Sequence, residues 1–269
     1  MRSPVRPLLA VWTGLVLAFL LLPIFTILPI GFSAGPFLGY PLPGLSLRWF
    51  HTVFDTYPWM FALKNSAIIG TATVLLALPL GTLAAWGLSS NALPGRAIVS
   101  AVLLSPMVMP IVIFGLAASF FLSRVGLQGS FTGLILAHTA LALPFVVIPV
   151  LATLSGFDAN LTRAAASLGA TPLATFRQVT LPLIMPGVAS GAVFAFITSF
   201  DEVVVALFVS SPSTLTLPRQ LFSGLRDQLD PALVAVATSL IVVSCLLMAS
   251  VEILRGRSAR LAARVVPSP

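Results

Sequence analysis

Six long apolar runs constrain this chain more than any other feature of its sequence. They lie near Leu8–Phe32, Phe61–Leu88, Ala97–Leu122, Phe131–Leu154, Gly187–Val209 and Ala232–Leu254. Each run has about 20 residues or more, the length that an α-helix needs to cross the hydrocarbon core of a bilayer. Only 8% of all residues are charged, against about 25% in soluble domains. The sequence therefore predicts an all-α, polytopic transmembrane bundle of about six spans.

The segments around these runs give the expected organisation of the chain. Residues 1–60 contain the first span and an outer loop, residues 61–254 form the membrane core, and residues 255–269 form a basic tail. The first apolar run is too long for the core of a signal peptide, so it is interpreted as a retained anchor.

The distribution of lysine and arginine predicts the orientation. With the N-terminus inside, nine basic residues fall in inner segments and five in outer ones. The inner ones are Arg2, Arg6, Arg96, Arg163, Arg177, Arg255, Arg257, Arg260 and Arg264, and the outer ones are Arg48, Lys64, Arg124, Arg219 and Arg226. Cytoplasmic segments carry the excess of positive charge, so both termini are expected in the cytoplasm. Because these charges are scattered between apolar runs, the net charge of +7 indicates contact with membrane lipid and no nucleic acid.

The polar segment Thr162–Val188 lies between two apolar runs. Its composition is that expected of a segment that docks onto another protein. We call it the docking segment. Its first part is alanine-rich and ends at Gly169, which is a good helix stop. Thr171 and Pro172 then predict the cap and first residue of a second short helix. Pro182 and Pro186 are expected to break the chain before the next run. An ordinary cytoplasmic loop with two helical turns is the alternative interpretation.

Asp201 and Glu202 are the most prominent charged residues within an apolar run. Carboxylates at such a depth are costly unless they face a cavity or a partner, and intramembrane acids are functional by default. Because the two residues are adjacent in a helix, their side chains are expected to point about 100° apart. They are candidates for a translocation path that attracts a cationic substrate. The alternative is a structural ion pair with Arg219 or Arg226.

Other residue types limit the chemistry of the chain. His138 is a lone histidine within an apolar run and is interpreted first as a hydrogen-bonded packing residue, with a proton relay as the alternative. Two histidines and one cysteine cannot by themselves build a zinc cluster. Lys64 is the only lysine, and it has no glycine-rich stretch before it. Because a P-loop needs such a stretch followed by Gly-Lys, the sequence predicts a transport subunit that is not an enzyme and carries no cofactor.

The docking segment resembles the cytoplasmic "EAA" loop in permease subunits of binding-protein-dependent ABC importers. Several of its residues match the family pattern in both type and spacing. The residues that carry the resemblance are Ala164, Ala165, Gly169, Phe176, Leu181, Pro182 and Pro186. It implies a type I ABC importer permease fold in the bacterial cytoplasmic (inner) membrane, with residues 61–254 as the permease core. It also implies that Ala164–Gly169 is a coupling helix that inserts into a cleft of an ATPase subunit. Arg163 stands where the family has glutamate, so an ionic contact of the family type is not expected there.

The same resemblance implies the partners of the chain. These are a second permease subunit, two copies of an ABC ATPase subunit that bind ATP and Mg, and an external solute-binding protein. Within the family, the most similar branch is that of the spermidine/putrescine (polyamine) permeases. The similarity lies in Ser199-Phe200-Asp201-Glu202-Val203, Thr216-Leu217-Pro218 and Gly224-Leu225-Arg226-Asp227. Polyamines are cationic, which agrees with the two acids.

Three other interpretations stay open on the sequence. Permeases for aminophosphonates or iron complexes share much of this region. A proton-coupled secondary transporter could use Asp201, Glu202 and His138 as a relay, and its uptake would depend on the proton gradient and survive ATP depletion. A membrane-embedded enzyme lacks support because the sequence shows no nucleophile or metal constellation.

Overall fold

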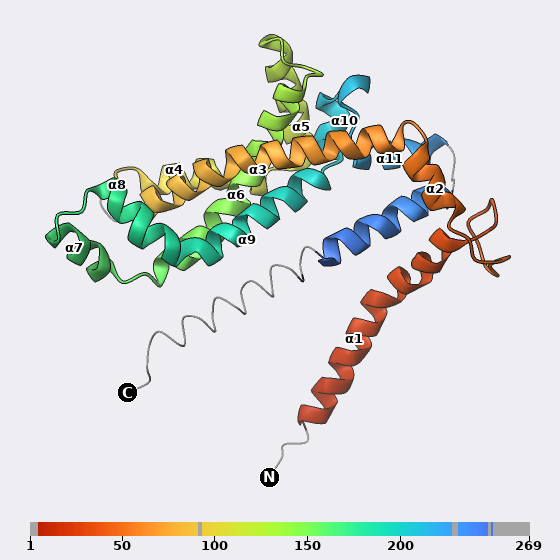
Figure 1. The fold of residues 1–269 in the computed structure, drawn as a ribbon, viewed down its shortest axis with the longest axis horizontal. Helices are drawn as coiled ribbons and strands as arrows, with labels where there is room; N and C mark the ends of the chain where they lie inside the picture. Colours follow the sequence, from red (N-terminus) through yellow and green to blue (C-terminus); the bar gives the residue numbers. More distant parts are fainter. Residues whose placement is uncertain (1–4, 91–92, 228–230, 247–248, 250–269) are drawn as a thin grey trace. The chain divides into compact units, whose positions relative to one another are not determined.

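The structure is a computed structural model that describes residues 5–90, 93–227, 231–246 and 249 of the chain. The described residues are helical apart from loops and one isolated antiparallel bridge between Ser33 and Leu45. They form two compact units (Figure 1). The anchor unit comprises the described residues of Met1–Met60 and Leu221–Val243, and the core unit comprises those of Phe61–Gln220 and Ser244–Pro269.

The described part of the anchor unit starts with a long apolar helix and ends with a shorter one. Its elements are α1 (Val5–Ile27), the 3-10 helix η1 (Leu28–Phe32), α2 (Arg48–Asp55) and most of an apolar helix over Pro231–Leu246. Side chains of α1 are exposed on all sides from Leu8 to Ile27. A helix that is apolar all round suits a lipid environment. Gly31 lies against the last helix, where a Cβ on this residue would be 2.9 Å from Thr238 Oγ1.

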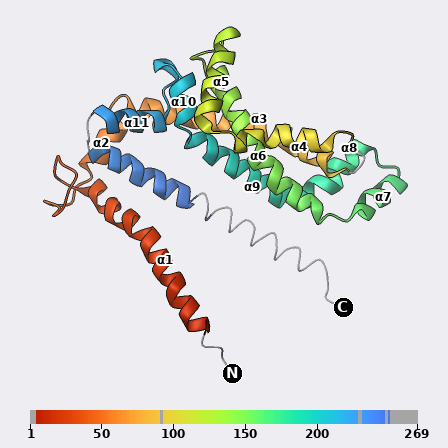
Figure 2. The same cartoon turned by 180° about the vertical axis from the view of Figure 1, so that it is seen from behind.

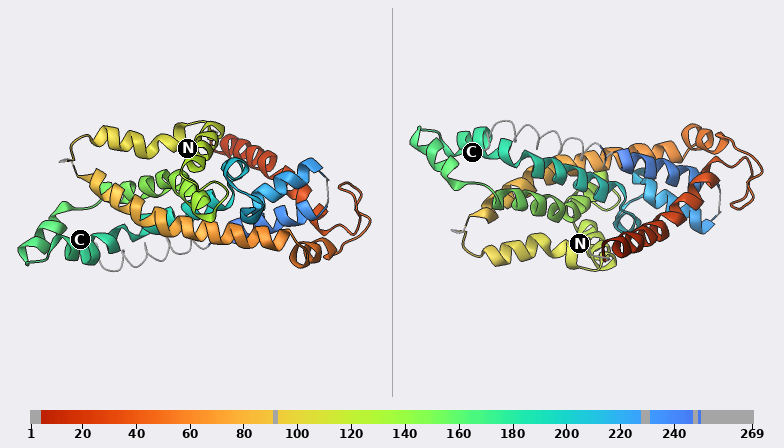
Figure 3. Two further views of the ribbon diagram at one scale, coloured as in Figure 1. Left: turned by 90° about the horizontal axis from the view of Figure 1, so that it is seen from above. Right: turned by 90° about the horizontal axis from the view of Figure 1, so that it is seen from below.

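The core unit contains three long helices that run side by side, α3, α6 and α9 (Figures 2 and 3). Its elements are α3 (Trp59–Ser89), α4 (Arg96–Val108), α5 (Ile111–Arg124), α6 (Phe131–Ser155), α7 (Ala159–Ser167), α8 (Pro172–Thr175), the π-helical turn η2 (Phe176–Thr180), α9 (Leu181–Phe200), α10 (Val204–Val209) and η3 (Pro212–Thr214). Helix α11 (Leu217–Asp227) then carries the chain from the core unit into the anchor unit.

Glycines let the three long helices approach one another closely. A Cβ on Gly187 of α9 would lie 2.7 Å from the Pro149 carbonyl oxygen of α6, and one on Gly81 of α3 would lie 2.7 Å from Val146. Val146 also faces Gly191 of α9. Small residues at such contacts maximise van der Waals packing between helices in a bilayer, where lipid is as apolar as the side chains. The buried cluster that results draws residues from all three helices, for example Ala77, Val147 and Val188.

The candidate membrane spans agree with the all-α prediction, and one of the predicted spans is bent. Within the described residues, four helices are long and apolar enough to cross a bilayer, and a fifth span results if α4 and α5 are counted together. The predicted run Ala97–Leu122 is in fact bent by 107° between these two helices. Pro110 explains the break because it lacks an N–H group and keeps Met109 extended. The predicted run Ala232–Leu254 extends beyond Leu246 into residues outside the described part.

The expectation that Pro182 and Pro186 break the chain is wrong. One span covers Pro172–Phe200, and both prolines lie within it. The turn η2 explains this result: the Leu181 N–H bonds to the Phe176 carbonyl, five residues back, so the helix is wider there. Pro182 follows directly in the first turn of α9, where a missing N–H costs least. The predicted span Gly187–Val209 is therefore wrong at both ends, because the observed span begins at Pro172 and ends at Phe200.

The close contact of α6 and α9 predicts a selective loss of stability in Gly187→Ala. Because the added methyl group meets the backbone of Pro149, this overpacking should cost about 1–3 kcal/mol. The matched control is Gly87→Ala in α3, where no atom lies within 4 Å of the added Cβ; its melting temperature should stay the same or rise. Thermal melting of the detergent-solubilised proteins measures both, and equal melting of the two variants would contradict the packing described.

Candidate functional site

The helix break after α9 separates the two acidic residues and gives them different environments. Asp201 directly follows the last residue of α9, its N–H bonds to the Ile197 carbonyl at 2.9 Å, and its side chain is exposed. Glu202 is 8% exposed, and its Oε1 accepts the Val205 N–H at 2.7 Å. Glu202 therefore caps the start of α10, whereas the Asp201 carboxylate has no hydrogen-bond partner within the described residues. This agrees with the expectation that the two side chains do not point to the same spot.

A structural ion pair does not account for these acids. In the described part of the chain, neither carboxylate lies within ion-pair distance of Arg219 or Arg226. Arg219 instead donates from Nη1 to the Ser210 hydroxyl at 2.5 Å. The carboxylate of Asp201 is therefore available to a ligand or a partner.

Three polar side chains connect the three long helices close to the break at the end of α9. His138 of α6 lies 2.9 Å from the Ser199 hydroxyl of α9 through Nδ1, and this hydroxyl lies 3.3 Å from the Thr73 hydroxyl of α3. His138 is 1% exposed, and its Nε2 has no hydrogen-bond partner in the described residues. The interpretation of His138 as a hydrogen-bonded packing residue is confirmed at Nδ1. A packing role does not explain why Nε2, the other ring nitrogen, is buried without a partner in the described residues.

Two residues that were not expected at a site hold the loop beyond the break. Asn65 of α3 donates from Nδ2 to the carbonyls of Leu215 at 2.9 Å and Ser213 at 3.3 Å. Ser66 accepts the Leu217 N–H at 2.8 Å. Polar residues side by side in an apolar run were the signal for this role, because buried polar groups need partners. Lys64, the preceding residue, is exposed.

The docking segment folds largely as its sequence predicts. Helix α7 is capped by Asp158, whose side chain accepts the Asn160 N–H at 2.9 Å, so it starts before Thr162. It ends just before Gly169, which has φ +85°, and the Ala170 N–H bonds to the Ala165 carbonyl at 3.0 Å. This is the hydrogen bond of a Schellman motif. Thr171 then caps α8 by accepting the Ala174 N–H at 3.3 Å, which confirms the predicted restart.

The turn between α7 and α8 is highly exposed. The Leu168 side chain is 88% exposed, and Ala164 and Gly169 are exposed as well. Ala165 is half-buried, and an apolar side chain as exposed as Leu168 suits burial against another protein. Arg163 lies 3.4 Å from the Asn160 side chain through Nη1 and has no acidic partner in the described residues.

Other predicted residues of the docking segment anchor it to the core unit or continue into the span. The Phe176 ring lies 4.6 Å from the Trp86 ring of α3, between ring centroids, so it connects the segment to that helix. Leu181 is half-buried and Pro182 exposed, at the start of α9. The later part of the docking segment and α9 thus form one helical span from Pro172 to Phe200, which ends next to Asp201.

The described residues thus form an all-α membrane core with an exposed helical turn at one end and a free carboxylate at the end of a span. Residues 77–260 match the family described as "Binding-protein-dependent transport system inner membrane component", and the chain belongs to this family.

The chain is similar to permeases of known cargo. It is 30% identical over 237 residues to the spermidine/putrescine transport system permease protein PotC of Escherichia coli K12, covering 88% of this chain and 89% of the relative. It is 36% identical over 205 residues to the putrescine transport system permease protein PotI of the same strain, covering 72% of each. A crystal structure of a bacterial ABC transporter that imports the acidic polysaccharide alginate matches with a TM-score of 0.70 at 18% identity, covering 96% of this chain and 98% of that one. This last similarity shows the fold alone.

The two acids should respond differently to truncation. Glu202→Ala removes the acceptor of the Val205 N–H and should lower the free energy of unfolding by about 1–3 kcal/mol, because a buried donor loses its partner. Glu202→Gln keeps a carbonyl oxygen there and should retain most of the stability. The matched control is Asp201→Ala, which should melt like the wild type. If Glu202→Ala melts like Asp201→Ala, the capping role of Glu202 is wrong.

Proposed function

We propose that this chain is the transmembrane permease subunit of an ATP-driven importer for polyamines (spermidine or putrescine) or another small cationic substrate. The observation that carries the proposal is the free, exposed carboxylate of Asp201 at the end of a membrane span, in a chain similar over most of its length to polyamine permeases. A carboxylate attracts an ammonium group, and an acid at the end of a span suits a substrate path. The alginate importer has the same fold with an acidic cargo, so the fold does not set the substrate.

In this proposal, Asp201 contacts the substrate and Glu202 positions the path. The buried Glu202 carboxylate is occupied by the Val205 N–H, so it holds the break between α9 and α10 in place. The break leaves Asp201 at a helix end, which allows its side chain to meet a cation without a helix covering it. The chain forms half of the path, and a second permease subunit supplies the other half.

The energy comes from a separate motor in this proposal. Two ABC ATPase subunits hold ATP and Mg, and they contact the exposed turn around Leu168 and Gly169. An external solute-binding protein delivers the substrate; a bacterial alginate ABC transporter of similar fold has been crystallised in complex with a substrate-bound periplasmic protein. Both termini and the docking segment face the cytoplasm of a bacterial cell, and the chain lies in its inner membrane.

The helical continuity from the docking segment to Asp201 supports a route for the power stroke. The Schellman turn at Gly169 fixes α7 against α8, and α8 continues through η2 into α9 without a break. Movement of the docking segment would therefore move α9 as a unit. The π-helical turn η2 lies within this continuous helix, as such turns often do at functional sites, and the Phe176–Trp86 contact passes the motion to α3.

Two other functions are alternatives that can be tested. A permease for a different substrate, such as an aminophosphonate or an iron complex, would have the same membrane core. A proton-coupled secondary transporter would use the unpartnered Nε2 of His138 with Asp201 and Glu202. In that case uptake would collapse with the proton gradient and survive the depletion of ATP.

The coupling role predicts that Gly169→Glu abolishes uptake, whereas the ATPase subunits released from it still hydrolyse ATP. Gly169 has φ +85°, and a bulky, charged side chain at this exposed turn would strain the backbone and obstruct docking. Gly169→Asn is the matched control, because asparagine tolerates this conformation; it should retain most uptake. The measurements are substrate uptake into reconstituted vesicles loaded with ATP and ATP hydrolysis by the same set of subunits in detergent. Wild-type uptake in Gly169→Glu would remove this role.

The substrate role predicts a change in apparent affinity in Asp201→Asn. Loss of one charge–charge contact of about 1.4 kcal/mol would raise the KM for spermidine or putrescine about tenfold. Asp201→Glu keeps the charge and should remain closer to the wild type, and Asp201→Asn should melt normally because its carboxylate is exposed. Radiolabelled polyamine uptake over a range of concentrations measures the effect. An unchanged KM in Asp201→Asn would contradict the assignment.

A further inference from the structure

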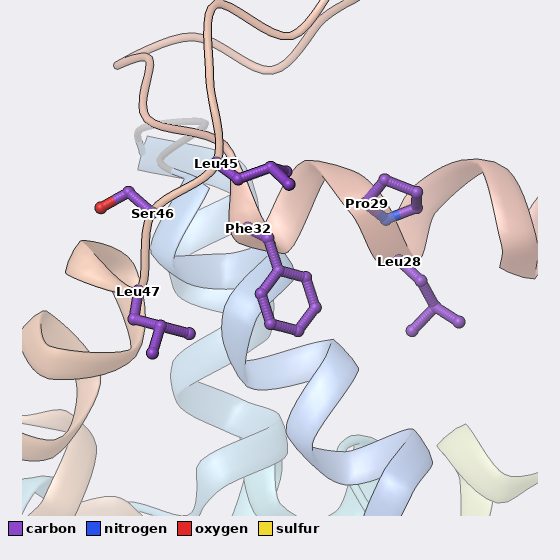
Figure 4. Close-up of a pocket in the computed structure, with 6 residues that line it drawn as sticks. All are labelled: Leu28, Pro29, Phe32, Leu45, Ser46 and Leu47. Carbon is purple, nitrogen blue, oxygen red and sulfur yellow. The ribbon is translucent and has the colours of Figure 1, made fainter.

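An apolar hollow lies in the anchor unit at the C-terminal end of α1 (Figure 4). Its volume is about 650 Å³, which falls in the range of about 300–1,000 Å³ found for ligand pockets. Five of its six lining residues are apolar, and they come from η1 and from the chain leading into α2: Leu28, Pro29, Phe32, Leu45, Ser46 and Leu47. The exposed fractions of Leu45 and Leu47 are 78% and 56%, so the lining is open to a ligand.

Backbone hydrogen bonds hold the walls of this hollow in place. The Ser46 N–H bonds to the Phe32 carbonyl at 2.7 Å, and the Ala34 N–H bonds to the Gly44 carbonyl at 3.0 Å. On the α2 side, the buried Trp49 donates from Nε1 to the Gly35 carbonyl at 3.2 Å. The shape of the hollow is therefore built by the fold and does not depend on a bound molecule.

Arg48 follows the lining residues of the hollow directly in the sequence, and most of its N–H donors are unused. Its guanidinium group lies 4.4 Å from the centroid of the Trp49 ring. Within the described residues, its side chain makes one hydrogen bond, from Nη1 to the Ala34 carbonyl at 3.1 Å. A guanidinium group has five N–H donors, so most of them can still contact an anion. The side chain is thus held in place, and no acidic group in the described residues neutralises its charge.

We propose that this hollow binds one anionic phospholipid, with an acyl chain against its apolar wall and the phosphate against Arg48. The combination of an apolar hollow and an adjacent guanidinium group matches the two parts of such a lipid. Helix α1 supports this occupant, because its exposed apolar side chains continue from the end next to the hollow, at Ile27, back to Leu8. The bound lipid would fasten the chain between η1 and α2 to the leaflet at this end of α1, independently of the substrate that is transported.

The test uses the full chain with Trp49 as its only tryptophan, after Trp12, Trp59 and Trp86 are changed to phenylalanine. The protein is placed in phosphatidylcholine nanodiscs, and the probe is phosphatidylglycerol brominated on its acyl chains, which quenches tryptophan emission on contact. We expect half-quenching of Trp49 at a fraction of brominated phosphatidylglycerol about fivefold lower than of brominated phosphatidylcholine. A fivefold preference corresponds to about 1 kcal/mol, the usual contribution of one arginine near an anionic membrane surface.

Two variants and one control separate this site from general contact with the bilayer. Arg48→Gln should remove the preference for phosphatidylglycerol, and Leu45→Glu, at an exposed position, should reduce it while Arg48 stays in place. Arg124→Gln removes an exposed arginine of the core unit and should leave the preference intact. Equal quenching by both lipids in the wild-type protein would overturn the proposal. So would a preference that persists in both Arg48→Gln and Leu45→Glu.

Discussion

The contact between α6 and α9 is the constraint on which the rest of the core unit depends. In a bilayer, apolar side chains gain little by leaving lipid, so helices associate through close van der Waals contact and interhelical hydrogen bonds. Gly187 and Gly191 provide the contact by letting α9 lie against the backbone of Pro149 and the side chain of Val146. The hydrogen bond between Ser199 and His138 adds a polar contact between the same two helices. Together these contacts hold α9, with Asp201 directly after its last residue, against α6.

The same helix joins the two candidate sites, one at each of its ends. Its continuation through η2 and α8 leads to the Schellman turn at Gly169, and its other end is the break at Asp201. Rigid secondary structure transmits displacement better than a loop, so a single span can relate a docking event at one end to a substrate contact at the other. The phenylalanine and tryptophan rings at Phe176 and Trp86 tie this span to α3 at the docking end.

Much of this arrangement could be predicted from local sequence signals. The apolar runs predict the all-α membrane fold, and the positions of Gly169, Thr171 and Pro172 predict the helix–turn–helix of the docking segment, because each acts within its own turn. The course of the chain at Pro182, Pro186 and Asp201 could not be predicted in the same way. There the outcome depends on a π-helical turn and on a buried carboxylate that caps the next helix. The roles of Asn65 and Ser66 depend on a loop about 150 residues further along the chain.

If this chain works as the membrane part of an importer powered by separate ATPase subunits, those subunits should stay bound to it after extraction with a mild detergent. The most direct measurement is affinity purification of the full chain from gently solubilised membranes, with identification of its partners by mass spectrometry. We expect recovery of a P-loop ATPase together with a permease subunit, and loss of the ATPase from the Gly169→Glu sample while the Gly169→Asn sample retains it. Recovery of this chain alone in several mild detergents would contradict the importer function and favour a secondary transporter.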